Sequence, residues 1–228
     1  MQTINENNLK RLSTIVDMVD NGSKIADVGS DHCYVPIFCC KQGKITFAQA
    51  IDNKKGPYER MVKAIENSGY SNMIEPSLSS GLDELNKNVD TLILAGMGGK
   101  LIISILEKNL AKLINVKTII VDGHNDRPEL IKYLEKSGYH LEKNEFIYEA
   151  GIAYDIMKWK KGEPLKPYTE EEFIYGPLNL ITKTDSWKKY WLNEERRITD
   201  ILKNKDLPAD KRKECENKIK SIKNVLKK

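Results

Sequence analysis

The stretch that decides the fold is Lys24-Ile25-Ala26-Asp27-Val28-Gly29-Ser30-Asp31-His32-Cys33-Tyr34-Val35-Pro36. It contains a short apolar run that ends at Asp27, a turn at Gly29, and then residues that can begin a helix. A buried strand, a glycine turn and a helix together form the first βα unit of a parallel sheet. Because ligands of such sheets bind beyond the carboxyl ends of the strands, we expect a cofactor beside Asp27 and Gly29.

Two further predicted strands end in residues that suit the same ligand. The apolar run 45–51 is closed by Asp52, about 20 residues or slightly more after the turn, where nucleotide-binding sheets hold a ribose hydroxyl pair. The run 91–94 is followed by Ala95-Gly96-Met97-Gly98-Gly99, whose glycines allow a ligand to approach the backbone closely. The three strand ends together predict a site for a nucleoside cofactor.

The blocks from Asp27 to Pro36 and from Ala95 to Gly99 resemble the signature sequences of bacterial TrmK-type methyltransferases. That family methylates N1 of the adenine at position 22 of tRNA. The resemblance runs through nearly the whole chain, and its shorter matches are Arg11-Leu12, Gly56-Pro57, Gly81-Leu82 and Gly176-Pro177. It implies S-adenosylmethionine as cofactor, tRNA as partner, and a class I methyltransferase fold with a helical appendage.

The same resemblance implies a set of cofactor-binding residues. The chain departs from the family at Ser80, where we expect an acid, and at Asp122-Gly123-His124-Asn125, where relatives often carry a Gln-Pro-Asn turn. The role of that turn therefore cannot be transferred, and His124 is predicted to be a loop residue rather than a base. The expected cofactor-binding residues are Asp27, Gly29, Ser30, His32, Asp52, Asn53, Ser80, Gly81, Ala95, Gly96 and Met97.

Asp31 is the candidate catalytic residue. It occupies a turn position where nucleotide-binding loops often carry glycine, so its carboxylate either faces the cofactor edge or caps the following helix. Adenine N1 becomes cationic as it is methylated, and a carboxylate near the exocyclic amine would stabilise that charge.

Tyr34 is a candidate for stacking on the substrate, with core packing as the alternative. Arg11 is interpreted either as a surface arginine or as a cation that reaches a cofactor carboxylate.

Alternating apolar runs and helical patterns predict a doubly wound, mostly parallel sheet. The last two runs, 140–148 and 152–159, predict a hairpin across Ala150-Gly151 that adds an antiparallel edge strand. The other expected strands are 45–51, 73–78, 91–94 and 117–121, and the expected helices between them are 34–42, 57–68, 100–106 and 128–137.

A change of composition near residue 160 divides the chain into a predicted cofactor domain, residues 1–160, and a basic helical appendage, residues 161–228. Residues 1–159 carry 19 Lys and Arg against 21 Asp and Glu, a net charge of −2, whereas residues 160–228 carry 18 against 12, a net charge of +6. Apolar residues at helical spacing predict two antiparallel, coiled-coil-like helices. Their basic faces indicate either a nucleic-acid partner or a solvated surface. The candidate RNA contacts are Tyr34, Arg196, Arg197, Lys211 and Arg212.

The remaining features narrow the class of protein. Four cysteines without paired spacing indicate neither a zinc site nor a disulfide framework, so no metal is expected and the reducing cytoplasm is the predicted compartment. No apolar stretch approaches a membrane span, and we expect a monomer or weak dimer. A dehydrogenase is disfavoured because Asp31 and His32 would crowd a pyrophosphate. A non-catalytic RNA- or partner-binding protein and a small-molecule methyltransferase remain as alternatives.

Overall fold

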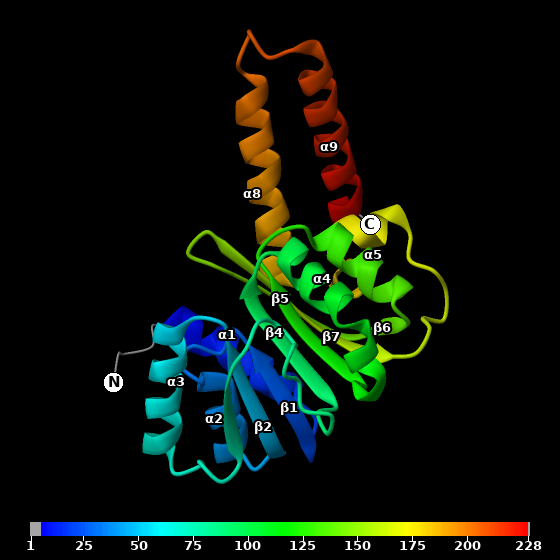
Figure 1. Ribbon diagram of the computed structural model, residues 1–228. Helices are drawn as coiled ribbons and strands as arrows, with labels where there is room; N and C mark the ends of the chain where they lie inside the picture. The colour runs from blue at the N-terminus through cyan, green and yellow to red at the C-terminus, as the bar shows by residue number, and fades with distance from the viewer. Residues whose placement is uncertain (1–5, 228) are drawn as a thin grey trace.

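The computed structural model describes residues 6–227, with side chains from Lys10 onward, and shows a seven-stranded sheet between two layers of helices (Figure 1). The strand order is β3-β2-β1-β4-β5-β7-β6. All neighbouring strands from β3 to β5 are parallel, and β7 runs antiparallel to both β5 and β6. The strands are β1 (Ser23–Val28), β2 (Ile45–Asp52), β3 (Ile74–Leu78), β4 (Thr91–Met97), β5 (Thr118–Gly123), β6 (Tyr139–Glu149) and β7 (Ile152–Lys161).

The helices that precede residue 160 divide between the two faces of the sheet. The chain passes from β1 through β2 to β3 toward one edge of the sheet, and from β4 to β5 toward the other edge. Because parallel crossovers are right-handed, the helices of these two halves lie on opposite faces. The first face carries α1 (Glu6–Met18), α2 (Tyr34–Lys41) and α3 (Lys55–Ser68). The second carries α4 (Gly99–Lys108), the 3-10 helix η1 (Leu110–Asn115) and α5 (Arg127–Lys136).

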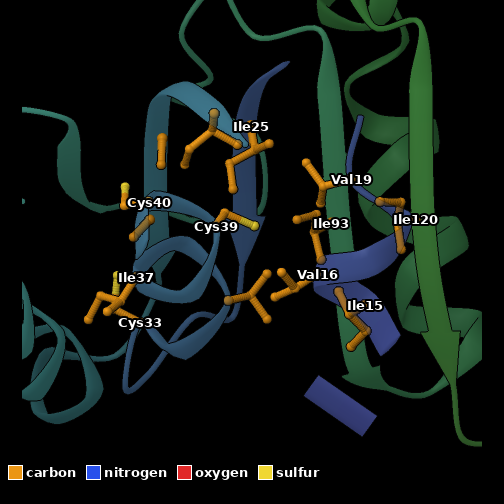
Figure 2. Packing of buried hydrophobic residues seen from close by; sticks show 14 of the residues in the cluster. Ile15, Val16, Val19, Ile25, Cys33, Ile37, Cys39, Cys40, Ile93 and Ile120 are labelled. Atoms are coloured by element: carbon orange, nitrogen blue, oxygen red, sulfur yellow. The ribbon is translucent and has the colours of Figure 1, made fainter. Parts of the chain in front are cut away.

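Each face of the sheet has its own apolar core. On the first face, Ile93 and Ile120 of the strands pack against Val16 of α1 and against Val19, which follows the helix, as Figure 2 shows. Cys33, Cys39 and Cys40 lie in the same cluster, and burial raises the pKa of the Cys39 thiol to about 12. These cysteines are therefore small apolar core residues rather than reactive thiols.

The predicted terminal hairpin is confirmed. β6 and β7 pair over nearly their full length, and the turn between them holds Ala150 and Gly151 at φ of 50° and 80°. β7 lies between β5 and the edge strand β6, with Asp122 opposite Ile156. The fold predicted from the sequence, a mostly parallel doubly wound sheet with antiparallel pairing at one edge, is confirmed.

Four helices follow the sheet: α6 (Glu170–Tyr175), α7 (Asn179–Thr182), α8 (Asp185–Leu202) and α9 (Ala209–Lys227). α8 and α9 form the expected antiparallel pair, which projects away from the sheet (Figure 1). The two short helices α6 and α7 were not predicted. α6 begins with a capping box between Thr169 and Glu172.

The base of the helical pair is tied to the sheet by aromatic packing. Trp187 and Trp191 of α8 cluster with Tyr175 and with Phe146 of β6, and the Trp187 indole N–H donates to the Tyr175 carbonyl at 3.0 Å. Phe173 of α6 joins the core that faces α4 and α5. Residues 170–182 thus pack on the sheet and its flanking helices, and the projecting part of the chain begins at α8. The division at residue 160 stays a prediction.

Candidate active site

A cavity of about 540 Å³ lies at the carboxyl edge of the parallel strands. Its walls come from the segments that follow β1, β2, β3 and β4, and from one side of α4. This is the position that the strand-end residues predict, and the volume is within the range of small-molecule sites. Nine predicted site residues line it: Gly29, Asp31, Asp52, Asn53, Ser80, Gly81, Ala95, Gly96 and Met97.

Asp27, Ser30 and His32 do not line the cavity. Asp27 pairs in register with Ala50 and Ile93, and its buried carboxylate accepts a hydrogen bond of 2.6 Å from the Ser30 hydroxyl. Burial raises the pKa of Asp27 to about 6, and the Ser30 hydrogen bond and the charge of Arg11 oppose this rise. Asp27 therefore lies just beneath the turn, and the cofactor contacts of these three residues stay predictions.

Asp52 ends β2 with one carboxylate oxygen available. Its Oδ1 accepts a hydrogen bond of 3.0 Å from the Lys54 backbone N–H, and the residue is 8% exposed. Oδ2 accepts no hydrogen bond from the residues that the structure describes. A buried carboxylate fixed through one oxygen suits the recognition of a hydroxyl pair by the other, as the spacing from the Gly29 turn predicts.

The loop after Gly29 holds Asp31 in a sparsely populated backbone conformation. Asp31 has φ of 40° and Cys33 has φ of 57°, both in the left-handed region that few non-glycine residues adopt. The helix-cap interpretation of Asp31 is wrong, because Cys33 is the N-cap of α2 and that helix has no side-chain cap. The Asp31 carboxylate instead pairs with Arg60 of α3 at 2.7 Å and lies 3.8 Å from the His32 Nε2.

Tyr34 lies behind this loop, outside the cavity wall. Its ring stacks between His32 and Phe38, with ring centroids 5.2 Å and 6.2 Å away. Tyr34 is half-buried, and its ring neighbour Phe38 packs against the core of the first face. Both interpretations of Tyr34 are consistent with this position, and its contact with a substrate stays a prediction.

The sequence analysis missed a buried ion pair beside the cavity. The Arg11 guanidinium donates through Nε to Asp122, the penultimate residue of β5, which is fully buried. The second oxygen of Asp122 has no hydrogen-bond partner. Arg11 also lies 5.6 Å above the Tyr154 ring, and a Cβ on Gly96 would lie 3.0 Å from its Nη2. Asp122 alone could have been singled out as an acid near the end of another buried strand, like Asp27 and Asp52, but nothing in the pattern pointed to its pairing with Arg11.

The wall that α4 contributes was also missed. Leu101, Ser104, Ile105 and Lys108 face the cavity, at the spacing of one helix side. The sequence analysis interpreted this helix only as an apolar one. Its start is fixed by the turn after β5, where the Asn125 side chain accepts a hydrogen bond of 3.0 Å from the Gly99 N–H. A Cβ on Gly99 would lie 2.6 Å from the Asn125 carbonyl oxygen, so only glycine fits there.

The four candidate RNA residues on α8 and α9 have different surroundings. Arg197 is bound to Glu194 at 2.8 Å and Lys211 to Glu214 at 3.1 Å, both within their own helix. Arg212 donates to the carbonyl oxygens of Leu202 and Asn204 and so closes the loop between the helices. Arg196 is exposed and forms no ion pair with the described residues. Arg196 is thus the member of this set that is most available to a ligand.

Within residues 6–227, no three or more His, Cys, Asp or Glu side chains are grouped to hold a metal ion. In the same part of the chain, no helix has both the length and the apolar character needed to cross a membrane.

The chain is similar to known methyltransferases. Residues 9–157 match the family model described as a methyltransferase domain. Over 95% of its length, the chain is 28% identical to the tRNA (adenine(22)-N(1))-methyltransferase of Bacillus subtilis, covering 96% of that protein.

Solved structures extend the similarity to the whole fold. The "putative tRNA (m1A22) methyltransferase" Sp1610 of Streptococcus pneumoniae superposes with a TM-score of 0.90 at 30% identity, covering 98% of this chain and 100% of that chain. A structure of the same protein in complex with S-adenosyl-L-methionine has a TM-score of 0.88 at 31% identity, covering 95% and 98%. The chain therefore belongs to the methyltransferase-domain family, in the group that contains these tRNA (m1A22) methyltransferases.

Proposed function

We propose that this protein transfers a methyl group from S-adenosylmethionine to N1 of the adenine at position 22 of tRNA. The observation that carries the proposal is the similarity over the whole length, helical pair included, to proteins named for this reaction. One of those relatives was solved with S-adenosyl-L-methionine bound. The cavity at the carboxyl edge is in the place where this fold binds a nucleoside cofactor.

The cavity residues fit that cofactor. The open carboxylate oxygen of Asp52 would accept from the ribose hydroxyls, and Gly29 and Gly96, at φ of 76° and 77°, leave the backbone uncovered. The Arg11 side chain beside Gly96 would hold the carboxylate of the methionine part. Asp27, Asp52 and Asp122 place buried acids at or next to the carboxyl ends of β1, β2 and β5, which favours a cationic ligand. When bound, the cofactor supplies an electrophilic methyl group on its sulfonium.

Asp31 is the proposed catalytic residue. Its Oδ1 is held by Arg60, and its Oδ2 accepts no hydrogen bond from the described residues. Adenine N1 attacks without prior deprotonation, and the ring becomes cationic as the new bond forms. Oδ2 would accept from the exocyclic amine and stabilise that positive charge. The protein's main contribution is to hold N1 in line with the methyl group.

The helical pair is the proposed docking element for tRNA. Its base packs on Phe146 and contacts Tyr148, whose hydroxyl accepts a hydrogen bond of 3.0 Å from Asn193. Tyr148 lies opposite Ala153 at the end of β6, which is the same edge of the sheet as the cavity. A nucleic acid bound along the helices would therefore extend toward the cavity. This arrangement favours tRNA over a small-molecule acceptor.

The cellular location and assembly complete the proposal. A tRNA substrate and four free cysteines, three of them buried, are consistent with the reducing cytoplasm. The expected monomer or weak dimer stays a prediction.

The test is methylation of unmodified tRNA in vitro, followed by digestion and identification of the methylated nucleoside by mass spectrometry. The expected product is 1-methyladenosine, lost when the adenine at position 22 is replaced. Cofactor binding without methyl transfer to any tRNA would favour the non-catalytic alternative. Transfer to free adenosine at the same rate as to tRNA would favour the small-molecule alternative.

A further inference from the structure

The Asp31–Arg60 pair is asymmetric. The Nε of Arg60 donates a hydrogen bond of 2.8 Å to Oδ1 of Asp31, and the Nη2 of Arg60 lies 2.7 Å from the same oxygen. Asp31 lines the cavity, whereas Arg60 lies outside it on α3. This one-sided contact holds Oδ1 in place and leaves Oδ2 without a hydrogen bond from the described residues, with the His32 Nε2 3.8 Å away.

We propose that Arg60 is a positioning residue for methyl transfer, which acts by holding the Asp31 carboxylate in the orientation that the acceptor base requires. This inference rests on the proposed function, because it assigns Asp31 to that reaction. The left-handed backbone conformation at Asp31 and Cys33 sets the direction in which the Asp31 side chain leaves the loop. Arg60 on α3 then fixes the χ2 torsion of that side chain. A misplaced catalytic group loses rate even when the fold and binding are unchanged.

A stabilising role for this pair is small. The Asp31 and Arg60 side chains are 41% and 49% exposed, and exposed ion pairs contribute little to the free energy of unfolding. The alternative role for Arg60 is contact with an RNA phosphate. In that case, replacing Arg60 would weaken tRNA binding and make the binding less dependent on salt. The positioning role predicts the opposite pattern: unchanged binding and a lower kcat.

The experiment compares the full-length parent with Arg60→Gln, Arg60→Lys, Asp31→Asn and the Asp31→Asn/Arg60→Gln double variant. The matched control is Lys63→Gln, which removes an exposed cation one turn further along α3. For each protein we would measure kcat for tRNA methylation, the Kd for S-adenosylmethionine by calorimetry, and the Kd for tRNA at several salt concentrations.

The expected results are a fall in kcat of about 10-fold in Arg60→Gln, partial recovery in Arg60→Lys, and no change in Lys63→Gln. In the Asp31→Asn background, Arg60→Gln should lower kcat no further, because the carboxylate that it orients is absent. Both Kd values should match the parent.

Three results would overturn the proposal. The first is an unchanged kcat in Arg60→Gln. The second is an additive loss in the double variant, and the third is a loss confined to tRNA affinity with a shallower salt dependence. In each of these the parent methylates tRNA, so the proposed function stands. A parent that transfers no methyl group to tRNA would instead remove the proposed function and this proposal with it.

Discussion

The cavity and the helical pair differ in how the sequence builds them. The cavity is made of turns at strand ends, where single residues such as Asp52 and Gly96 have fixed positions on a rigid sheet. The α8–α9 pair is made of a narrow apolar seam with charged outer faces, and only its base shares a core with the sheet. Function in the first region therefore depends on individual atoms, and in the second on summed charge.

This difference has a consequence for substitutions. Loss of one side chain at the cavity should change cofactor affinity or rate sharply, because each position has one partner. Loss of one lysine on the helices should have little effect, because phosphate contacts are numerous and additive. The predictions below test whether the two regions separate in this way.

The largest expected change is in the pH dependence of stability at Asp27. Its folded pKa of about 6 lies above the ordinary value of 3.8, so the folded state binds the proton more tightly and loses stability as pH rises between these values. A pKa difference of about 2 corresponds to about 3 kcal/mol. Asp27→Asn should therefore gain stability relative to the parent, by up to about 3 kcal/mol, as the pH rises from about 3.5 to about 7. Urea unfolding of both proteins across this range would show it, and parallel curves would contradict it.

Asp31→Asn is expected to lower kcat by about 10²-fold or more, which is the scale of losing one electrostatic stabiliser. The amide keeps the shape of the side chain and removes its charge. Single-turnover methylation of tRNA gives the rate, and calorimetry of S-adenosylmethionine binding is the control that the site is intact. A parent-like rate would remove Asp31 from the reaction.

Asp52→Ala should weaken S-adenosylmethionine binding by roughly 1.5–3 kcal/mol, because the ribose hydroxyls lose a charge-assisted acceptor. The tRNA affinity should be unchanged, since Asp52 belongs to the cavity alone. Calorimetric titration measures the first quantity and filter binding the second. An equal loss of both affinities would mean that the two regions are not separate.

The sequence predicted the sheet and most of the cavity because both follow from local patterns. Asp27, Asp52 and the glycines after residue 94 mark strand ends, and parallel strands bring their ends to one edge whatever the loops between them do. The Arg11–Asp122 pair could not be predicted, because 111 residues separate its members. The Asp31–Arg60 pair could not be predicted either, because 29 residues separate its members. The helices α6 and α7 are too short to show a periodic pattern, and their formation depends on the tertiary contacts of Phe173 and Asn179.

The central claim is that tRNA docks through the charged faces of the helical pair. Deleting residues 161–228 would test it poorly, because Phe173 and Tyr175 would leave the core. A better variant is Arg196→Gln/Lys213→Gln/Lys218→Gln/Lys220→Gln, which changes four exposed residues of α8 and α9. The matched control is Lys24→Gln/Lys87→Gln/Lys117→Gln/Lys136→Gln, which removes the same charge from exposed positions near the amino-terminal edge of the sheet.

The deciding measurement is the Kd for tRNA as a function of salt concentration, with the Kd for S-adenosylmethionine measured on the same samples. We predict that the helical variant binds tRNA more weakly and with a shallower salt dependence, while the control variant binds like the parent and both bind the cofactor normally. The account would be contradicted if the helical variant bound tRNA like the parent, or if the two variants lost affinity equally.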